Sequence, residues 1–127
     1  MALYRAWFAT KRRKWLLQED VAERAKELML ATAAEKGIRL LDCETMVDHV
    51  HLLLDVEDRI SLSKAMNLLK GVSARRLNQE FPDLRLDVAV GQVWQHRYAA
   101  KIVAAAAVPA VAGYIRTQWE RLEKYER

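Results

Sequence analysis

The chain has 127 residues and a mass of 14.7 kDa, and 52% of its residues are hydrophobic, so we expect one domain over residues 1–127 with a single core. The lone Cys43 excludes an internal disulfide and a thiolate metal cluster, and with no export signal or membrane anchor evident we expect a cytoplasmic protein without a membrane partner. A formal net charge of +4 permits binding to nucleic acid without requiring it.

The first two predicted elements are a strand and a helix. Tyr4–Thr10 is rich in aromatic and β-compatible side chains and runs into the basic stretch Lys11–Lys14, which is typical of a strand that leaves into a charged loop. Asp20–Lys36 has apolar residues at helical spacing among Glu and Lys, and Gly37 follows as a natural C-terminal cap.

A hairpin and a second helix come next. Ile38–Met46 and His49–Val56 predict two strands joined by a tight antiparallel turn. Ser61 is the expected N-cap of a helix that runs to about Gln79 and ends before Pro82. Its predicted core stripe consists of Leu62, Ala65, Met66, Leu69, Val72 and Leu77.

The last part of the chain completes an α+β pattern. Val93–Val103 predicts one or two further strands, and Pro109 fits the first turn of a final helix. The order strand, helix, strand, strand, helix, strand, helix predicts a ferredoxin-like antiparallel sheet with helices packed on it and an additional C-terminal helix.

Two histidines carry the most specific chemical signal. Along His49–Val56, alternation places His49 and His51 on one face and the apolar Val50, Leu52 and Leu54 on the other. Two imidazoles at this spacing form half of a metal site, although such a pair alone is more often an ordinary surface feature. The third ligand would be an oxygen donor, the remaining His96, or a group of the substrate.

The predicted final helix offers one candidate ligand and one candidate nucleophile. Tyr114 and Gln118 are four residues apart and so share a helical face. Two imidazoles and a carboxamide oxygen suit Mg²⁺ or Mn²⁺ and leave positions open for phosphate oxygens and water. The phenolic oxygen of Tyr114 could then attack a phosphorus atom.

Several sequence blocks occur together in a recognisable order. They are Phe8–Arg13, Met46–Leu54, Leu69–Arg76, Val93–Trp94, Tyr98 and Tyr114–Gln118. In this order they resemble the single-tyrosine transposases of small bacterial and archaeal insertion sequences, within the HUH endonuclease superfamily, over nearly the whole chain.

The resemblance implies a complete mechanism. His49 and His51 would be the paired metal ligands and Gln118 the third, with Mg²⁺ or Mn²⁺ as the cofactor and no small organic cofactor. Tyr114 would be the nucleophile that becomes linked to a DNA 5′-phosphate while a 3′-hydroxyl is freed. The resemblance further implies a homodimer that binds single-stranded DNA with hairpin-forming ends.

Two basic groups are candidate DNA contacts, and the first is interleaved with the aromatic Trp7 and Trp15, which could stack on unpaired bases. Either group could equally be a solvated charged face. Their members are Lys11, Arg12, Arg13, Lys14, Lys70, Arg75 and Arg76.

Three other functions compete with transposition. A non-catalytic module that binds single-stranded nucleic acid would use the same fold without needing a metal or Tyr114. A domesticated transposase-like enzyme acting on chromosomal palindromic repeats would share the chemistry. A two-metal carboxylate nuclease is the least favoured, because its candidate ligands are scattered over both faces and the turns of the hairpin. Those candidates are Asp42, Glu44, Asp48 and Asp55.

Overall fold

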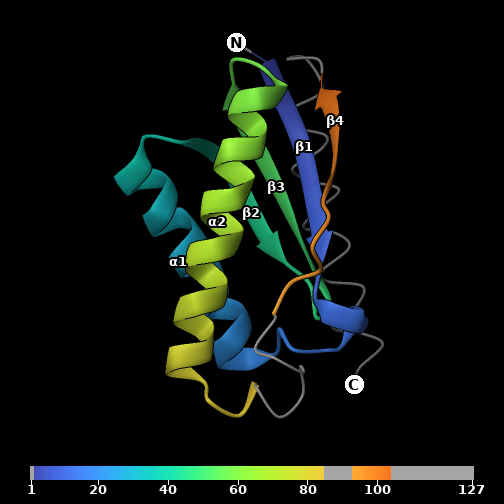
Figure 1. Ribbon diagram of the computed structural model, residues 1–127, viewed down its shortest axis with the longest axis vertical. Coiled ribbons are helices and arrows are strands. Elements are labelled where there is room, and N and C mark those ends of the chain that lie inside the picture. The colour runs from blue at the N-terminus through green and yellow to red at the C-terminus, as the bar shows by residue number, and fades with distance from the viewer. Residues whose placement is uncertain (1, 85–92, 104–127) are drawn as a thin grey trace.

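The computed structural model describes residues 2–84 and 93–103 (Figure 1). The elements follow the predicted order as far as the fourth strand, and the predicted final helix that begins at Pro109 lies outside the described residues. They are β1 (Ala2–Ala9), a 3-10 turn (Lys11–Arg13), α1 (Glu19–Lys36), β2 (Arg39–Thr45), β3 (His49–Val56), α2 (Arg59–Glu80) and β4 (Ala99–Val103).

The four strands form one antiparallel sheet in the order β2-β3-β1-β4, which confirms the predicted α+β fold. The central strands are therefore β1 and β3, and their register sets Trp7 opposite His51 and Ala9 opposite His49. Of the predicted region Val93–Val103, only the second half is a strand, while Trp94 makes an isolated bridge to Thr10.

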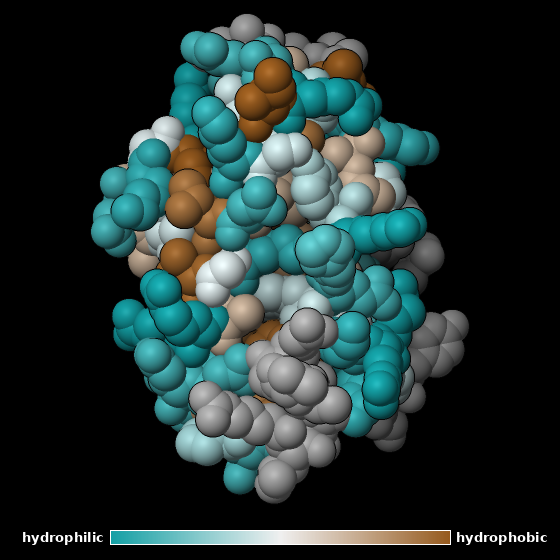
Figure 2. Space-filling view, in the orientation of Figure 1, coloured by the Kyte–Doolittle hydropathy of each residue, from teal (hydrophilic) through white to brown (hydrophobic). Residues whose placement is uncertain are grey.

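Both helices pack on the same face of the sheet (Figure 1). In the core, their apolar residues cluster with one alternating set of strand side chains. From β3 this set contains Val50, Leu52 and Leu54, all fully buried as the alternation predicts. Burial of each such side chain contributes about 1.5–3 kcal/mol to folding. On the helix-covered face, the described residues are mainly hydrophilic with scattered hydrophobic spots (Figure 2). Within the described ranges, no helix has the length and apolar character needed to cross a membrane.

The helix ends agree with the sequence except at the start of α2. Gly37 ends α1 with a φ of 69°, in the left-handed conformation that glycine adopts without strain. The N-cap of α2 is Asp58 and not Ser61, because the Asp58 carboxylate accepts a hydrogen bond from the Ser61 amide at 2.8 Å. The helix thus begins earlier than predicted.

One position of the predicted α2 stripe is also wrong. Val72 is only half-buried, whereas its neighbour Ser73 is fully buried. The Ser73 hydroxyl donates to the Leu69 carbonyl at 2.6 Å and accepts a hydrogen bond from the indole nitrogen of Trp94 at 2.9 Å. This buried contact fastens the 93–98 segment to α2, and it is invisible to a pattern that tracks only apolar side chains.

Candidate active site

The fold brings His49 and His51, hereafter the His pair, together at the start of β3. Their ring centroids lie 4.9 Å apart and their planes make an angle of 70°. The alternation of β3 places both rings on the face opposite the helices. This separation allows two imidazoles to ligate one cation.

A cavity of about 240 Å³ opens beside the His pair. Trp7, directly across the β1–β3 ladder, stacks on His51 with the ring centroids 6.4 Å apart, and the Arg5 guanidinium lies 4.9 Å from the Trp7 ring centroid. The cavity therefore combines aromatic, cationic and imidazole groups. It is lined by Trp7, Phe8, Ala9, Arg13, His49 and His51.

His51 is held as a neutral imidazole. The residue is only 8% exposed, and burial, with smaller effects of His49 and Arg5, lowers its pKa to about 4. Within the part of the chain that the structure describes, its Nδ1 atom is buried and makes no hydrogen bond. A buried polar atom without a partner is unfavourable in a purely structural role, and a metal ligand is one role that would satisfy it.

His49 has a different environment, because its Nδ1 atom lies 2.6 Å from the carboxylate oxygen Oδ1 of Asp48. The other oxygen of this carboxylate accepts a hydrogen bond from Nε of Arg13 at 3.2 Å. From the sequence we considered Asp48 only as a candidate ligand of the least favoured carboxylate nuclease, and not as a partner of His49. Its position directly before a candidate ligand is the one signal that points to it.

The His pair fits a divalent cation as far as the described residues extend. Neutral imidazoles are suitable ligands, but residues 2–84 and 93–103 contain no group of three His, Cys, Asp or Glu side chains that could hold a metal. The predicted third ligand, Gln118, and the predicted nucleophile, Tyr114, lie outside these ranges. The alternative ligand His96 is exposed and lines a different cavity together with Lys70 and Trp94.

The predicted DNA-binding cations differ in their surroundings. Arg13 contacts Asp48, Arg76 pairs with Glu80 at 3.3 Å, and Lys70 donates to the backbone carbonyls of Gln95 at 2.7 Å and His96 at 3.1 Å. Burial also lowers the pKa of Lys70. These three cations therefore have structural contacts. Arg12 and Arg75 are exposed, and Lys11 and Lys14 are half-buried.

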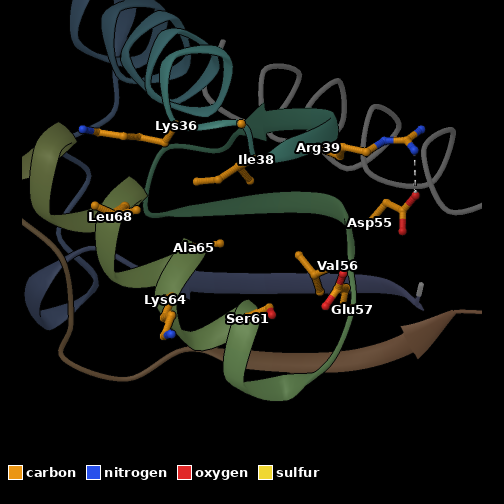
Figure 3. A pocket seen from close by; sticks show the side chains of 11 residues that line it. Lys36, Ile38, Arg39, Asp55, Val56, Glu57, Ser61, Lys64, Ala65 and Leu68 are labelled. Atoms are coloured by element: carbon orange, nitrogen blue, oxygen red, sulfur yellow. Dashed lines mark ion pairs between the residues drawn. The ribbon is translucent and has the colours of Figure 1, made fainter.

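A second cavity, of about 400 Å³, lies at the other end of β3 (Figure 3). The apolar part of its lining includes Ile38, Val56 and Leu68. At its rim Arg39 pairs with Asp55, the guanidinium nitrogen Nη1 lying 3.4 Å from the carboxylate oxygen. No histidine or cysteine is among the described residues that line it.

Comparison with known proteins places the chain among transposases. The family described as "Transposase IS200 like" matches residues 2–118. The ISDra2 transposase TnpA of Deinococcus radiodurans is 30% identical over 118 residues, which cover 93% of this chain and 84% of that protein. The transposase for insertion sequence element IS200 of Salmonella typhimurium is 28% identical over 95 residues, covering 75% of this chain and 62% of that protein.

Two solved structures share the fold. The crystal structure of a Deinococcus radiodurans protein assigned as a transposase has a TM-score of 0.73 and 32% identity, covering 91% of this chain and 89% of that one. A REP-associated tyrosine transposase bound to a REP hairpin has a TM-score of 0.61, covering 90% of this chain and 64% of that one, and at 13% identity it shows the fold alone. Since the family match spans nearly the whole sequence, this chain belongs to the IS200-like transposase family.

Proposed function

We propose that this transposase cleaves and rejoins single-stranded DNA at insertion-sequence ends, with Tyr114 as the nucleophile and with His49, His51 and Gln118 as ligands of Mg²⁺ or Mn²⁺. The observation that carries the proposal is the His pair, two imidazoles 4.9 Å apart beside a cavity. The buried Nδ1 atom of His51 has no hydrogen-bond partner among residues 2–84 and 93–103. The family membership supports DNA transposition as the reaction.

The proposed chemistry is an exchange of phosphodiester partners. A divalent cation bound to these ligands would supply Lewis acidity toward the scissile phosphate. The Tyr114 oxygen loses its proton and forms a bond to phosphorus, while the bond from phosphorus to the 3′ oxygen breaks. The 3′ oxygen leaves with the electron pair and takes up a proton. Because the phosphotyrosine remains an ester, the 3′-hydroxyl of another strand can reverse the attack without an external energy source.

We further propose that the DNA partner carries a hairpin and that the active species is a homodimer. A relative of the same fold is bound to a hairpin, and the resemblance noted in the sequence implies a dimer. Exposed Arg12 and Arg75 are the cations best placed to contact DNA phosphates, since the structure leaves their side chains open to solvent. Trp15, 54% exposed beside the basic turn, is available to stack on an unpaired base.

The decisive experiment is a covalent-adduct assay. Purified protein is incubated with Mn²⁺ and labelled single-stranded oligonucleotides that carry the element ends, and adducts are separated under denaturing conditions. The adduct should form, disappear in EDTA, and disappear in Tyr114→Phe. Tyr98→Phe is the matched control, because Tyr98 contacts Ser63 through its hydroxyl at 2.8 Å and has no proposed catalytic role.

The alternatives give different results in the same assay. Tight hairpin binding without any adduct would favour the non-catalytic binding module. Adduct formation on chromosomal palindromic repeats in place of element ends would favour the domesticated enzyme. Mixing His49→Ala with Tyr114→Phe tests the dimer, since recovery of activity requires that two chains contribute to one active site.

A further inference from the structure

The histidines of the His pair are held in place by different means, and this difference carries a further inference that rests on the proposed function. His51 is oriented by burial and by its stack on Trp7, and its Nδ1 has no partner among the described residues. His49 has a dedicated partner, the Asp48 carboxylate, at 2.6 Å from Nδ1. A carboxylate only accepts hydrogen bonds, so this contact requires the proton of a neutral His49 ring to be on Nδ1. The unprotonated nitrogen is then Nε2, which carries the ring lone pair.

Asp48 is itself fixed from two directions. Its backbone carbonyl accepts a hydrogen bond from the amide of the buried Thr10 at 2.8 Å. Its Oδ2 atom contacts two nitrogens of the Arg13 guanidinium, Nε and Nη2, each at 3.2 Å. The carboxylate therefore has one oxygen for the imidazole and one for the guanidinium.

The turn that delivers Arg13 is unusual. Arg12 and Arg13 have φ values of 58° and 53°, in the left-handed region that non-glycine residues rarely adopt. The turn is held by the Thr10 hydroxyl, which donates to the Lys14 carbonyl at 2.6 Å, and by the Lys11 amide, which donates to the Val93 carbonyl at 2.8 Å. These two contacts thus maintain a strained turn that places Arg13 against Asp48.

We propose that Asp48 is a positioning residue that locks His49 in the tautomer with the proton on Nδ1, so that Nε2 is the ligating atom, and that Arg13 orients the Asp48 carboxylate. Carboxylate partners of this kind fix the ring and raise the basicity of a ligating histidine. Arg13, grouped in the sequence with the DNA-binding cations, thereby acts on the metal ligands. Its side chain is 60% exposed, so its effect should be smaller than that of Asp48.

The first test reads the tautomer directly in metal-free protein. Nitrogen-15 NMR of histidine-labelled protein in alkaline buffer, where imidazoles are neutral, distinguishes protonated from unprotonated ring nitrogens. In the wild type the proton of His49 should be on Nδ1, and in Asp48→Ala it should shift toward Nε2. Asp48→Asn should also lose the Nδ1 preference, because the Asn amide can rotate and donate an N–H to the Nδ1 atom of His49. An unchanged His49 tautomer in Asp48→Ala overturns the proposal.

Asp55→Ala is the matched control. Asp55 is at the other end of β3 and pairs with Arg39, whose side chain is 61% exposed, much as Asp48 pairs with Arg13. Removing Asp55 should leave the His49 tautomer unchanged, and a shift there equal to that in Asp48→Ala would contradict a specific role for Asp48. Circular dichroism of each variant verifies the fold, and Asp48→Asn provides a variant of nearly the same shape should Asp48→Ala fold poorly.

The second test measures Mn²⁺ affinity from the electron paramagnetic resonance of the free ion. Asp48→Ala should bind Mn²⁺ about 10–100-fold more weakly than wild type, and Arg13→Ala more weakly by a smaller factor. If wild type binds Mn²⁺ and Asp48→Ala binds it equally well, the inference fails while the proposed function stands. If wild type and His49→Ala bind Mn²⁺ alike, the metal function fails, and the tautomer measurement still decides the role of Asp48.

Discussion

The two ends of β3 are built from similar parts and differ in chemistry. At each end a carboxylate pairs with an exposed arginine: Asp48, just before the strand, with Arg13, and Asp55, within the strand, with Arg39. At each end there is also a cavity. The cavity at the Asp55 end is the larger, about 400 Å³ against about 240 Å³, and part of its lining is apolar (Figure 3). The smaller cavity alone has the His pair beside it. The two imidazoles therefore identify the Asp48 end as the candidate site. A choice between the two ends by cavity volume alone would have selected the Asp55 end.

The largest expected effect comes from removing an imidazole at the histidine end. His49→Ala should reduce adduct formation by at least roughly 100-fold, because one of the proposed ligands is lost. Asp55→Ala, at the opposite end of the same strand, should retain adduct formation near the wild-type level. Equal losses in the two variants would mean that β3 as a whole is sensitive and that its ends are not functionally distinct.

The second effect is a dependence of stability on pH that comes from His51. The pKa of His51 is lowered to about 4 in the folded chain from an ordinary value of 6.5, so between these pH values the unfolded chain binds more protons than the folded chain. The free energy of unfolding should therefore fall by roughly 1–3 kcal/mol as the pH drops through this window. Above the window, this contribution of His51 to stability is fully present. Urea denaturation across this pH range measures the slope.

His51→Gln should remove this part of the pH dependence, since the amide does not titrate. His96→Gln is the comparison, because it removes an exposed imidazole outside the His pair. A slope that survives in His51→Gln would assign the pH dependence to other groups and would contradict the neutral, buried state of His51.

A third comparison uses two lysines of α2. Lys64 is exposed and lines the cavity at the Asp55 end, whereas Lys70 is half-buried and donates to the carbonyls of Gln95 and His96. Lys70→Met should lower the free energy of unfolding by about 1–3 kcal/mol, because the Gln95 and His96 carbonyls lose a charged hydrogen-bond donor. Lys64→Met should change it by less than about 0.5 kcal/mol. Equal values in urea denaturation would show that the Lys70 contacts contribute no net stability.

The smallest expected effect belongs to the ion pair at the Asp55 end. Arg39→Ala should lower the free energy of unfolding by no more than about 1 kcal/mol, because an exposed arginine gains little from such a pair. Mn²⁺ affinity should stay at the wild-type value, in contrast to Arg13→Ala. Thermal unfolding and Mn²⁺ titration of the two variants provide the comparison, and weakened Mn²⁺ binding in Arg39→Ala would remove the distinction between the two ends.

The sequence predicted what local periodicity controls. Alternation along His49–Val56 correctly separated the core face from the face of the His pair, and Gly37 correctly marked the end of α1. The N-cap of α2 was predicted wrongly, because Ser61 and Asp58 are both good caps and sequence alone does not rank them.

Contacts between distant segments could not be predicted. From the sequence, Lys70 is interpreted as a surface cation, but in the structure it donates to the backbone carbonyl of Gln95. Arg13 is interpreted as part of a basic run, but in the structure it contacts Asp48. The two residues of each contact are too far apart in sequence for helical or strand periodicity to relate them. The roles of Tyr114 and Gln118 stay predictions, since both lie outside the described residues.

The central position of β1 has a consequence for the order of assembly. The β2–β3 hairpin is local and can form early, but β1 must pair with both β3 and β4, which are distant in sequence. Trp7 and Arg13, which line the cavity beside the His pair, come from β1 and from the turn after it. The hairpin alone would thus carry the two histidines without Trp7, which stacks on His51, and without Arg13, which contacts Asp48. We expect a competent metal site to appear only when the sheet closes, as a late event of folding.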